Sequence, residues 1–221
     1  MSIFAALDVY HDETSRSAAL NMAIDEALLE VATVPTIRFY QWDHPAISFG
    51  YFGKFDDVAA HLNRRDIVRR WTGGGIVFHG QDLTYSVVIP NSVRAFAESS
   101  ISIYEKIHRA LGAGLAANGQ SVELAATPMP KISESCFANP VRADVLLNGF
   151  KVAGAAQRRT RRSLLQQGSI QNVDFGNGFA DLFAKNLSAE YRRERLAAAL
   201  LTRAEEIAVQ KYATTAWLRR R

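Results

Sequence analysis

Apolar residues recur along this chain with two different periods. Between residues 15 and 32, apolar side chains such as Leu20 and Leu28 follow one another at helical spacing, which predicts an amphipathic helix. A second long helix is predicted to start near Ser102, where Ser102 and Glu105 form a capping box. Three further helices are predicted at Phe179–Leu187, at 190–200 and in a segment that ends near Arg219.

Short runs of β-branched and aromatic residues predict strands. These runs lie at 37–42, 46–52, 67–71 and 83–89. The first two are expected to pair across Asp43-His44-Pro45, which is a turn signal. A short helix at 57–63 and a loop at 125–135 complete the prediction. The predicted fold is therefore α+β, with a mixed, largely antiparallel sheet flanked by helices in one domain over residues 1–221.

The clearest local signal is Asn148-Gly149 between two strand-like runs, because this dipeptide is preferred in two-residue type I′ hairpins. A hairpin with this turn carries alternate side chains on opposite faces. The pairs that it predicts are Leu147 with Phe150, Leu146 with Lys151, Val145 with Val152, and Asp144 with Ala153.

This register makes Asp144 and Lys151 diagonal neighbours on one face of the hairpin, within reach of a long side chain. From the pattern alone, a solvated lysine on an open face is the simpler interpretation. The small residues 153–156, with Gly154 and Ala155 among them, favour a binding role instead. Small side chains let a ligand approach a strand closely.

Three consecutive glycines, Gly73, Gly74 and Gly75, form the second unusual segment. Glycine permits positive φ, and such a run can present backbone N–H groups to an anion or an acyl carbonyl. The spacing is that of neither a Walker A loop nor a Rossmann fingerprint. Taken alone, the run fits a plain tight turn, and the nearby His79 fits a hydrogen-bonded structural residue.

Composition narrows the class of protein. With 221 residues, 48% of them hydrophobic, the chain can bury a sizeable core, which excludes disorder as the default. No apolar run approaches the roughly 20 residues needed to span a bilayer, and no secretory signal is expected at the start of the chain. Cys136 is the one cysteine, so a reducing, cytoplasmic location is expected.

The net charge is +4, and the arginines gather in two clusters, at 158–162 and at 219–221. Such clusters are either solvated or a landing patch for an acidic partner. No recognition helix, zinc site or RNA-binding signature accompanies them, so no nucleic-acid partner is expected.

Several segments, taken together, resemble the biotin/lipoate protein ligase and octanoyltransferase superfamily. The resemblance covers about residues 15–175, with its motifs in the family's order. The motifs are Arg-Arg-Trp-Thr-Gly-Gly-Gly-Ile-Val-Phe-His at 69–79, Asp-Leu-Thr-Tyr-Ser at 82–86, Asn-Gly-Phe-Lys-Val-Ala-Gly-Ala-Ala-Gln at 148–157 and Gln-Gly-Ser-Ile at 167–170, with weaker matches at 21–26 and 38–42.

The resemblance implies a cofactor-attachment fold in which Lys151 contacts the acyl carbonyl. It also implies that the glycine segment lines an acyl tunnel. The substrate-binding residues implied in this way are Arg70, Thr72, Gly73, Gly74, Gly75, His79, Asp144, Gly154 and Ala155. No metal ligand is expected.

Two chemistries occur in this superfamily. The segment Cys-Phe-Ala-Asn-Pro at 136–140 resembles the Cys-Phe-x-x-Pro segment of the cysteine-dependent octanoyltransferases, which makes Cys136 the expected nucleophile. The expected reaction is octanoyl or lipoyl transfer from an acyl-carrier-protein thioester to a lysine of a lipoyl domain, without a cofactor. Glycine cleavage H protein and the E2 subunit of 2-oxoacid dehydrogenases carry such lipoyl domains.

An ATP-dependent lipoate–protein ligase is the alternative within the superfamily, and it would need ATP and Mg. Gly75, the third glycine, favours this alternative, and Gly80 departs from the common aspartate after the histidine. The expected single domain favours the transferase. A non-catalytic basic binding protein on the same fold is the third interpretation.

Overall fold

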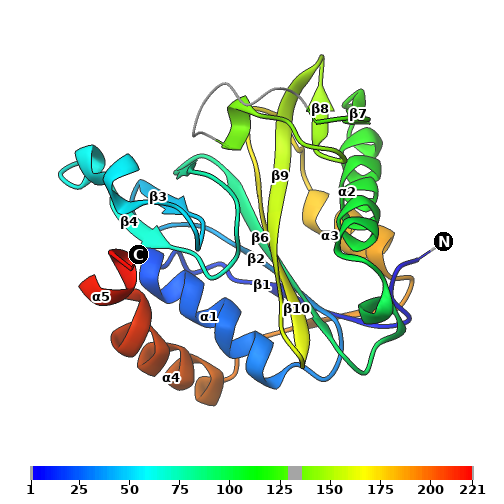
Figure 1. Cartoon of the computed structure of the whole chain (residues 1–221). Helices are drawn as coiled ribbons and strands as arrows, with labels where there is room; N and C mark the ends of the chain where they lie inside the picture. Colours follow the sequence, from blue (N-terminus) through cyan, green and yellow to red (C-terminus); the bar gives the residue numbers. More distant parts are fainter. Residues whose placement is uncertain (1, 129–135, 221) are drawn as a thin grey trace.

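The computed structural model of the chain describes residues 2–128 and 136–220, except for the side chain of residue 136 (Figure 1). An eight-stranded mixed sheet forms its centre, in the order β11-β1-β2-β6-β10-β9-β8-β7, and a three-stranded sheet, β4-β3-β5, lies beside it. The large sheet contains β1 (Leu7–His11), β2 (Thr36–Tyr40), β6 (Leu83–Pro90), β7 (Val122–Leu124), β8 (Val145–Leu147), β9 (Phe150–Arg159), β10 (Ser163–Ile170) and β11 (Tyr191–Glu194). The small sheet contains β3 (Ala46–Phe49), β4 (Asp66–Arg69) and β5 (Val77–His79).

Helices cover both faces of the large sheet (Figure 1). Helices α2 (Ser100–Ala117) and α3 (Phe179–Leu187) pack on one face over an apolar core that includes Tyr85 and Phe183. Helices α1 (Ala18–Val31) and α4 (Ala198–Ile207) form a second core on the other face. None of the helices in the described part of the chain is long and apolar enough to cross a membrane.

The end of the chain is fixed to the small sheet by one buried arginine. Helix α5 (Thr215–Leu218) follows a π-helical turn at Ala208–Tyr212 and lies beside β4 (Figure 1). Arg69, at the end of β4, is 1% exposed. Its guanidinium donates to backbone carbonyls on both sides, those of Tyr51, Gly53, Trp217, Leu218 and Arg220, at 2.7–3.3 Å. All three guanidinium nitrogens of Arg69 therefore have hydrogen-bond acceptors, which compensates for the water that the charged group loses on burial.

The predicted strands exist, but one predicted pairing is wrong. The segments predicted at 37–42 and 46–52 are β2 and β3, and they belong to different sheets: β2 pairs with β1 and β6, and β3 pairs with β4 and β5. The turn at Asp43-His44-Pro45 therefore carries the chain from one sheet to the other. The helix predicted at 57–63 is a pair of short 3₁₀ turns, Phe55–Asp57 and Ala59–His61.

Two helix predictions also need correction. Helix α2 begins two residues earlier than predicted, because Ser99 and not Ser102 caps it: the Ser99 hydroxyl accepts a hydrogen bond from the Ser102 N–H. Glu105 instead forms ion pairs with Arg109 and Arg142. The helix predicted at 190–200 is wrong at its start, since Tyr191–Glu194 is strand β11, parallel to β1.

The predicted hairpin exists, with φ of 52° at Asn148 and 79° at Gly149, both positive as a type I′ turn requires. Leu146 lies opposite Lys151, as predicted. The register then shifts, because a β-bulge places Val145 opposite Ala153 instead of Val152. The bulge breaks the strict alternation of faces beyond that point.

Stability should fall at acid pH because of a histidine in the core. His108 is fully buried on α2, with Nδ1 2.7 Å from the Ala143 carbonyl and Nε2 3.1 Å from the Tyr85 hydroxyl. Burial lowers its pKa from 6.5 to about 4. Between these two values the unfolded chain binds a proton that the folded chain does not, so the free energy of unfolding should fall by about 3 kcal/mol as pH drops from 6.5 to 4.

Urea unfolding of the protein and of His108→Gln at several pH values between 7 and 4 measures this contribution. The free energy of unfolding of the variant should depend less on pH in this window, although the variant is less stable at pH 7. Parallel pH profiles would contradict the assignment to His108.

Candidate active site

A narrow cavity of about 30 Å³, partly open to solvent, lies between the large sheet and the small sheet. Strands β9, β10 and β6 form one wall, β3 and β5 with the segment that follows β4 form another, and Met22 of α1 closes part of the space. Of the residues predicted from the sequence, the cavity brings together Arg70, His79, Lys151, Gly154 and Ala155.

Lys151 is the second residue of β9, next to the hairpin turn, and its side chain lines the cavity. It is 8% exposed, and its Nζ lies 2.8 Å from Oδ2 of Asp144, which is fully buried. Asp144 also accepts hydrogen bonds from the Val141 N–H at 2.7 Å and from the Tyr104 hydroxyl. A carboxylate with these donors is held in one orientation, and so it fixes the ammonium of Lys151 beside the cavity.

Tyr104 connects this pair to the cavity wall. Its hydroxyl donates to Asp144 and accepts from the Ala155 N–H at 3.0 Å. Burial and then the negative charge of Asp144 raise the pKa of Tyr104 well above its ordinary value. The hydroxyl therefore stays protonated and remains a donor to Asp144. Tyr104 lies among the buried apolar residues of α2, and that pattern gives no sign of its hydroxyl's partner.

The absence of a side chain at Gly154 makes room for the side chain of Lys151. A Cβ built at this position would lie 2.3 Å from Cε and 2.6 Å from Nζ of Lys151, and 3.1 Å from Oδ1 of Asp144. The lysine side chain thus lies directly over the glycine. Any larger residue there must displace Lys151 from its place beside the cavity.

Gly154→Ala should therefore lower activity while the fold is kept. We expect kcat to fall by about 100-fold, because a misplaced catalytic group costs roughly this much. Gly112→Ala on α2 is the matched control, since the nearest atom to its Cβ is 3.6 Å away. Kinetics and thermal unfolding of both variants test the prediction, which fails if Gly154→Ala retains wild-type kcat.

His79 lies in a chain of buried polar groups along the cavity. Its Nδ1 is 2.7 Å from Oδ2 of Asp82, and its Nε2 is 2.6 Å from Oγ of Ser48. Trp42 stacks on the ring, with 4.0 Å between centroids. Burial lowers the pKa of His79, so the neutral ring donates from Nδ1 and accepts the Ser48 hydroxyl at Nε2.

Asp82 anchors that chain. Its Oδ2 also accepts from the hydroxyls of Thr84 at 2.8 Å and Ser169 at 2.7 Å, and its Oδ1 accepts from the Gly80 N–H. Burial pushes the pKa of Asp82 upward, but the opposing effects of His79 and the hydrogen bonds are larger, and the pKa lies below its ordinary value. The sequence gives no sign of the bonds of Ser48 to His79 and of Asp82 to Ser169, because in each case the two residues lie far apart in the chain.

Arg70 braces the glycine segment. Its Nη1 donates to Oγ of Ser48 at 2.7 Å, and its Nη2 donates to the carbonyls of Gly73 and Gly75 at 2.9 and 3.0 Å. These glycines are not among the described residues that line the cavity, and φ is positive at Gly74 alone of the three. This segment packs against Gly50, and the expectation that it lines an acyl tunnel stays a prediction.

Thr72 does not line the cavity itself but hydrogen-bonds to a residue that does. Its hydroxyl donates to Oε1 of Gln167, which lines the cavity, and Nε2 of Gln167 donates to Asp25 of α1 at 2.8 Å. Asp25 is fully buried and also accepts from Arg38, Tyr40 and Ser86. This network fixes α1 to the sheet and explains the buried polar residues Asp25 and Arg38 in the segments 21–26 and 38–42.

Cys136 begins the 3₁₀ turn Cys136–Ala138, and its side chain lies outside the part of the chain that the structure describes. Its neighbour Phe137 lines the cavity, with its ring centroid 5.5 Å from Nζ of Lys151. Consecutive Cα atoms are about 3.8 Å apart. The backbone of residue 136 therefore lies near the end of the cavity that holds Lys151.

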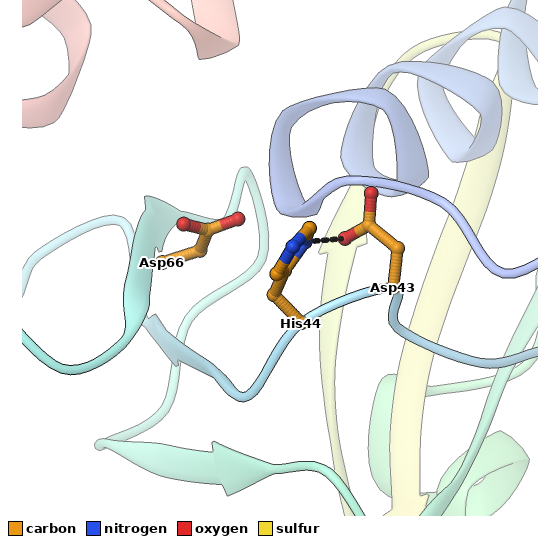
Figure 2. Close-up of side chains that lie close together, drawn as sticks. All are labelled: Asp43, His44 and Asp66. Carbon is orange, nitrogen blue, oxygen red and sulfur yellow. Dashed lines mark ion pairs between the residues drawn. The ribbon is translucent and has the colours of Figure 1, made fainter.

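One cluster of potential metal ligands occurs among the described residues, and none of its members lines this cavity. Asp43, His44 and Asp66 offer ligand atoms within 4.8 Å of one another, and the structure shows an ion pair of 3.1 Å between Asp43 and His44 (Figure 2). All three residues are exposed. Exposed acidic side chains often gather without binding a metal, and we assign no function to this cluster.

Comparisons with known proteins agree on one family. A family profile described as the lipoyl protein ligase A/B catalytic domain matches residues 17–200. Octanoyltransferase LipM of Oceanobacillus iheyensis is 37% identical over 196 residues, which cover 83% of this chain and 70% of the relative. Octanoyltransferase LipM of Brevibacillus brevis is 35% identical over 173 residues, covering 70% and 62%. The chain thus spans about two thirds of the length of these relatives.

A solved structure of lipoate-protein ligase A bound with ATP superposes with a TM-score of 0.76, at 19% identity, over 99% of this chain and 98% of that one. At this identity the likeness concerns the fold. It confirms the predicted mixed α+β architecture with helices on both sides of the sheet.

Proposed function

Because the chain belongs to the lipoyl protein ligase A/B catalytic domain family, we propose that it transfers an octanoyl group from a carrier-protein thioester to a lysine of a lipoyl domain, through Cys136. The observation that supports this most directly is the cavity itself. Lys151 lies inside it, and Phe137, the residue after Cys136, forms part of its wall. The relatives named octanoyltransferase give the acyl group.

In the first step the thiolate of Cys136 attacks the thioester carbonyl, the carbon–sulfur bond to the carrier breaks, and the carrier leaves as a thiolate that takes a proton from solvent. The negative charge that develops on the carbonyl oxygen needs a positioned donor. Lys151 supplies it, since its ammonium is held by Asp144 and reaches the cavity. One thioester is exchanged for another, so the step is nearly thermoneutral and requires no ATP.

In the second step the amine of the acceptor lysine attacks the acyl-enzyme, an amide forms, and the Cys136 thiolate is released. The amine must lose a proton, which passes to solvent or to the departing thiolate. An amide is more stable than a thioester, so this step makes the overall transfer favourable.

The residues behind Lys151 hold it in place. Asp144 orients its ammonium, and Tyr104 orients Asp144. The chain Asp82–His79–Ser48–Arg70 braces the opposite wall of the cavity by hydrogen bonds. In this proposal these groups position the acyl chain, and Cys136 and Lys151 are the catalytic residues.

The proposal is tested by the choice of substrates. Octanoyl carrier protein and a lipoyl domain, incubated with the enzyme without ATP, should give an octanoylated lipoyl domain. Free octanoate with ATP and Mg should give none. Product from the second mixture alone, with release of pyrophosphate, would identify a ligase, and no product from either mixture would favour a binding protein.

A further inference from the structure

The two arginine clusters of the sequence, 158–162 and 219–221, come together on one aromatic side chain. The guanidinium carbon of Arg158 lies 5.0 Å from the ring centroid of Tyr51, and that of Arg220 lies 4.5 Å from the same centroid. Positions 62 residues apart along the chain thus share one ring. Neither the spacing of the clusters nor their composition indicates this convergence.

Two tryptophans extend the surface. Arg158 also lies over Trp71, at 5.1 Å, and Arg220 lies over Trp217, at 5.7 Å. We call Tyr51, Trp71, Trp217, Arg158 and Arg220 the arginine–aromatic patch. Stacking on an aromatic face restricts a guanidinium without neutralising its charge. The two cations are therefore presented in fixed positions.

In the part of the chain that the structure describes, no acidic side chain pairs with the two arginines of the patch. Among the described residues, Arg158 and Arg220 form no ion pair with an aspartate or a glutamate. Lys211, which lies over Trp71 and Trp217, differs in this respect because Glu26 holds its ammonium at 2.6 Å. Two uncompensated cations on a shared ring repel each other, and an anionic partner relieves that repulsion.

The patch adjoins the proposed active site. Trp71 directly follows Arg70, which lines the cavity, and Arg158 lies two residues beyond Ala156, another lining residue of β9. Residues two apart on a strand point to the same face. A partner bound to the patch therefore lies next to the cavity wall, at the side where β9 leaves it.

We propose that the arginine–aromatic patch docks an acidic surface of the carrier protein that delivers the acyl thioester. This inference rests on the proposed function and adds the place where one of the two protein substrates binds. Charge favours the donor over the acceptor. The acceptor must bring a lysine to the cavity, and a basic surface repels the ammonium form of that lysine, whereas it attracts an acidic carrier.

The experiment compares a protein donor with a small neutral one. Octanoyl transfer to a lipoyl domain is measured with octanoyl carrier protein and, separately, with octanoyl-N-acetylcysteamine, for Arg158→Glu, Arg220→Glu and the wild type. Arg195→Glu, the same charge change at an exposed arginine beyond β11, is the matched control. Thermal unfolding of each variant shows whether it is folded.

Each patch variant should lower kcat/KM for the carrier protein about tenfold, through KM, and should change the rate with the neutral thioester by less than about twofold. Added salt should lower kcat/KM of the wild type for the carrier toward the values of the variants. Arg195→Glu should behave as the wild type.

Equal losses with both donors, an equal loss in Arg195→Glu, or a rise in KM for the lipoyl domain instead of the carrier would overturn the docking proposal.

Binding of the unacylated carrier protein to the enzyme can be measured without catalysis, by fluorescence anisotropy at low salt. If the wild type transfers nothing but binds the carrier more tightly than both patch variants, the proposed function fails and the docking surface stands. An oligonucleotide that displaces the carrier at equal concentration would also overturn the assignment.

Discussion

Cys136→Ala should abolish octanoyl transfer from the carrier protein, with a loss of at least about 1,000-fold in kcat/KM. The proposed route places the acyl group on this sulfur between the two half-reactions, and alanine offers no atom that can accept it. The chain contains no second cysteine to take over. Transfer of octanoate to a lipoyl domain, followed by mass spectrometry, measures the loss.

Cys136→Ser distinguishes chemistry from folding. The serine variant keeps the size and polarity of the side chain, but its hydroxyl is a far weaker nucleophile than a thiolate. It should be as inactive as the alanine variant within the limits of the assay, and both should unfold at the temperature of the wild type. Full activity of either variant would remove Cys136 from the mechanism.

Lys151→Met should reduce kcat by about 1,000-fold, because it removes the charged donor from the cavity, and one such donor contributes roughly this factor in acyl transfer. Methionine preserves the length of the apolar stem over Gly154. The buried carboxylate of Asp144 loses its cation but keeps the donors Tyr104 and Val141. The variant should therefore fold, with the free energy of unfolding lowered by about 3 kcal/mol.

Lys106→Met provides the control. Lys106 of α2 forms an exposed ion pair with Glu98, and such pairs contribute little to stability. This variant should retain full activity. Loss of the circular dichroism spectrum in Lys151→Met would mean that the residue is structural. An unchanged kcat would show that Lys151 takes no part in catalysis.

The sequence was sufficient for the family, the fold class and the expected kind of enzyme, an acyltransferase related to octanoyltransferases, and these predictions are confirmed. It was also sufficient for the hairpin turn, because Asn148-Gly149 encodes the positive φ angles locally. The neighbourhood of Asp144 and Lys151 was reached from the same turn. The roles of Cys136 and Lys151 remain predictions.

Local patterns failed wherever the structure depends on distant partners. The segment Tyr191–Glu194 is a polar run without an apolar stripe of either period, and it becomes a strand because β1 pairs with it in parallel. The bulge beside Leu146 has no signature in the sequence. The hydrogen bonds of Ser48 with His79, of Asp82 with Ser169 and of Gln167 with Asp25 join segments far apart in the chain, so no spacing rule predicts them.

The mass of the intact enzyme tests the central claim most directly. The enzyme is mixed with octanoyl carrier protein in the absence of both ATP and a lipoyl domain, and its mass is recorded before and after a lipoyl domain is added. The proposed mechanism predicts a gain of one octanoyl group, carried on the peptide that contains Cys136, which disappears when the lipoyl domain is added. An unmodified enzyme that still octanoylates the lipoyl domain would contradict it.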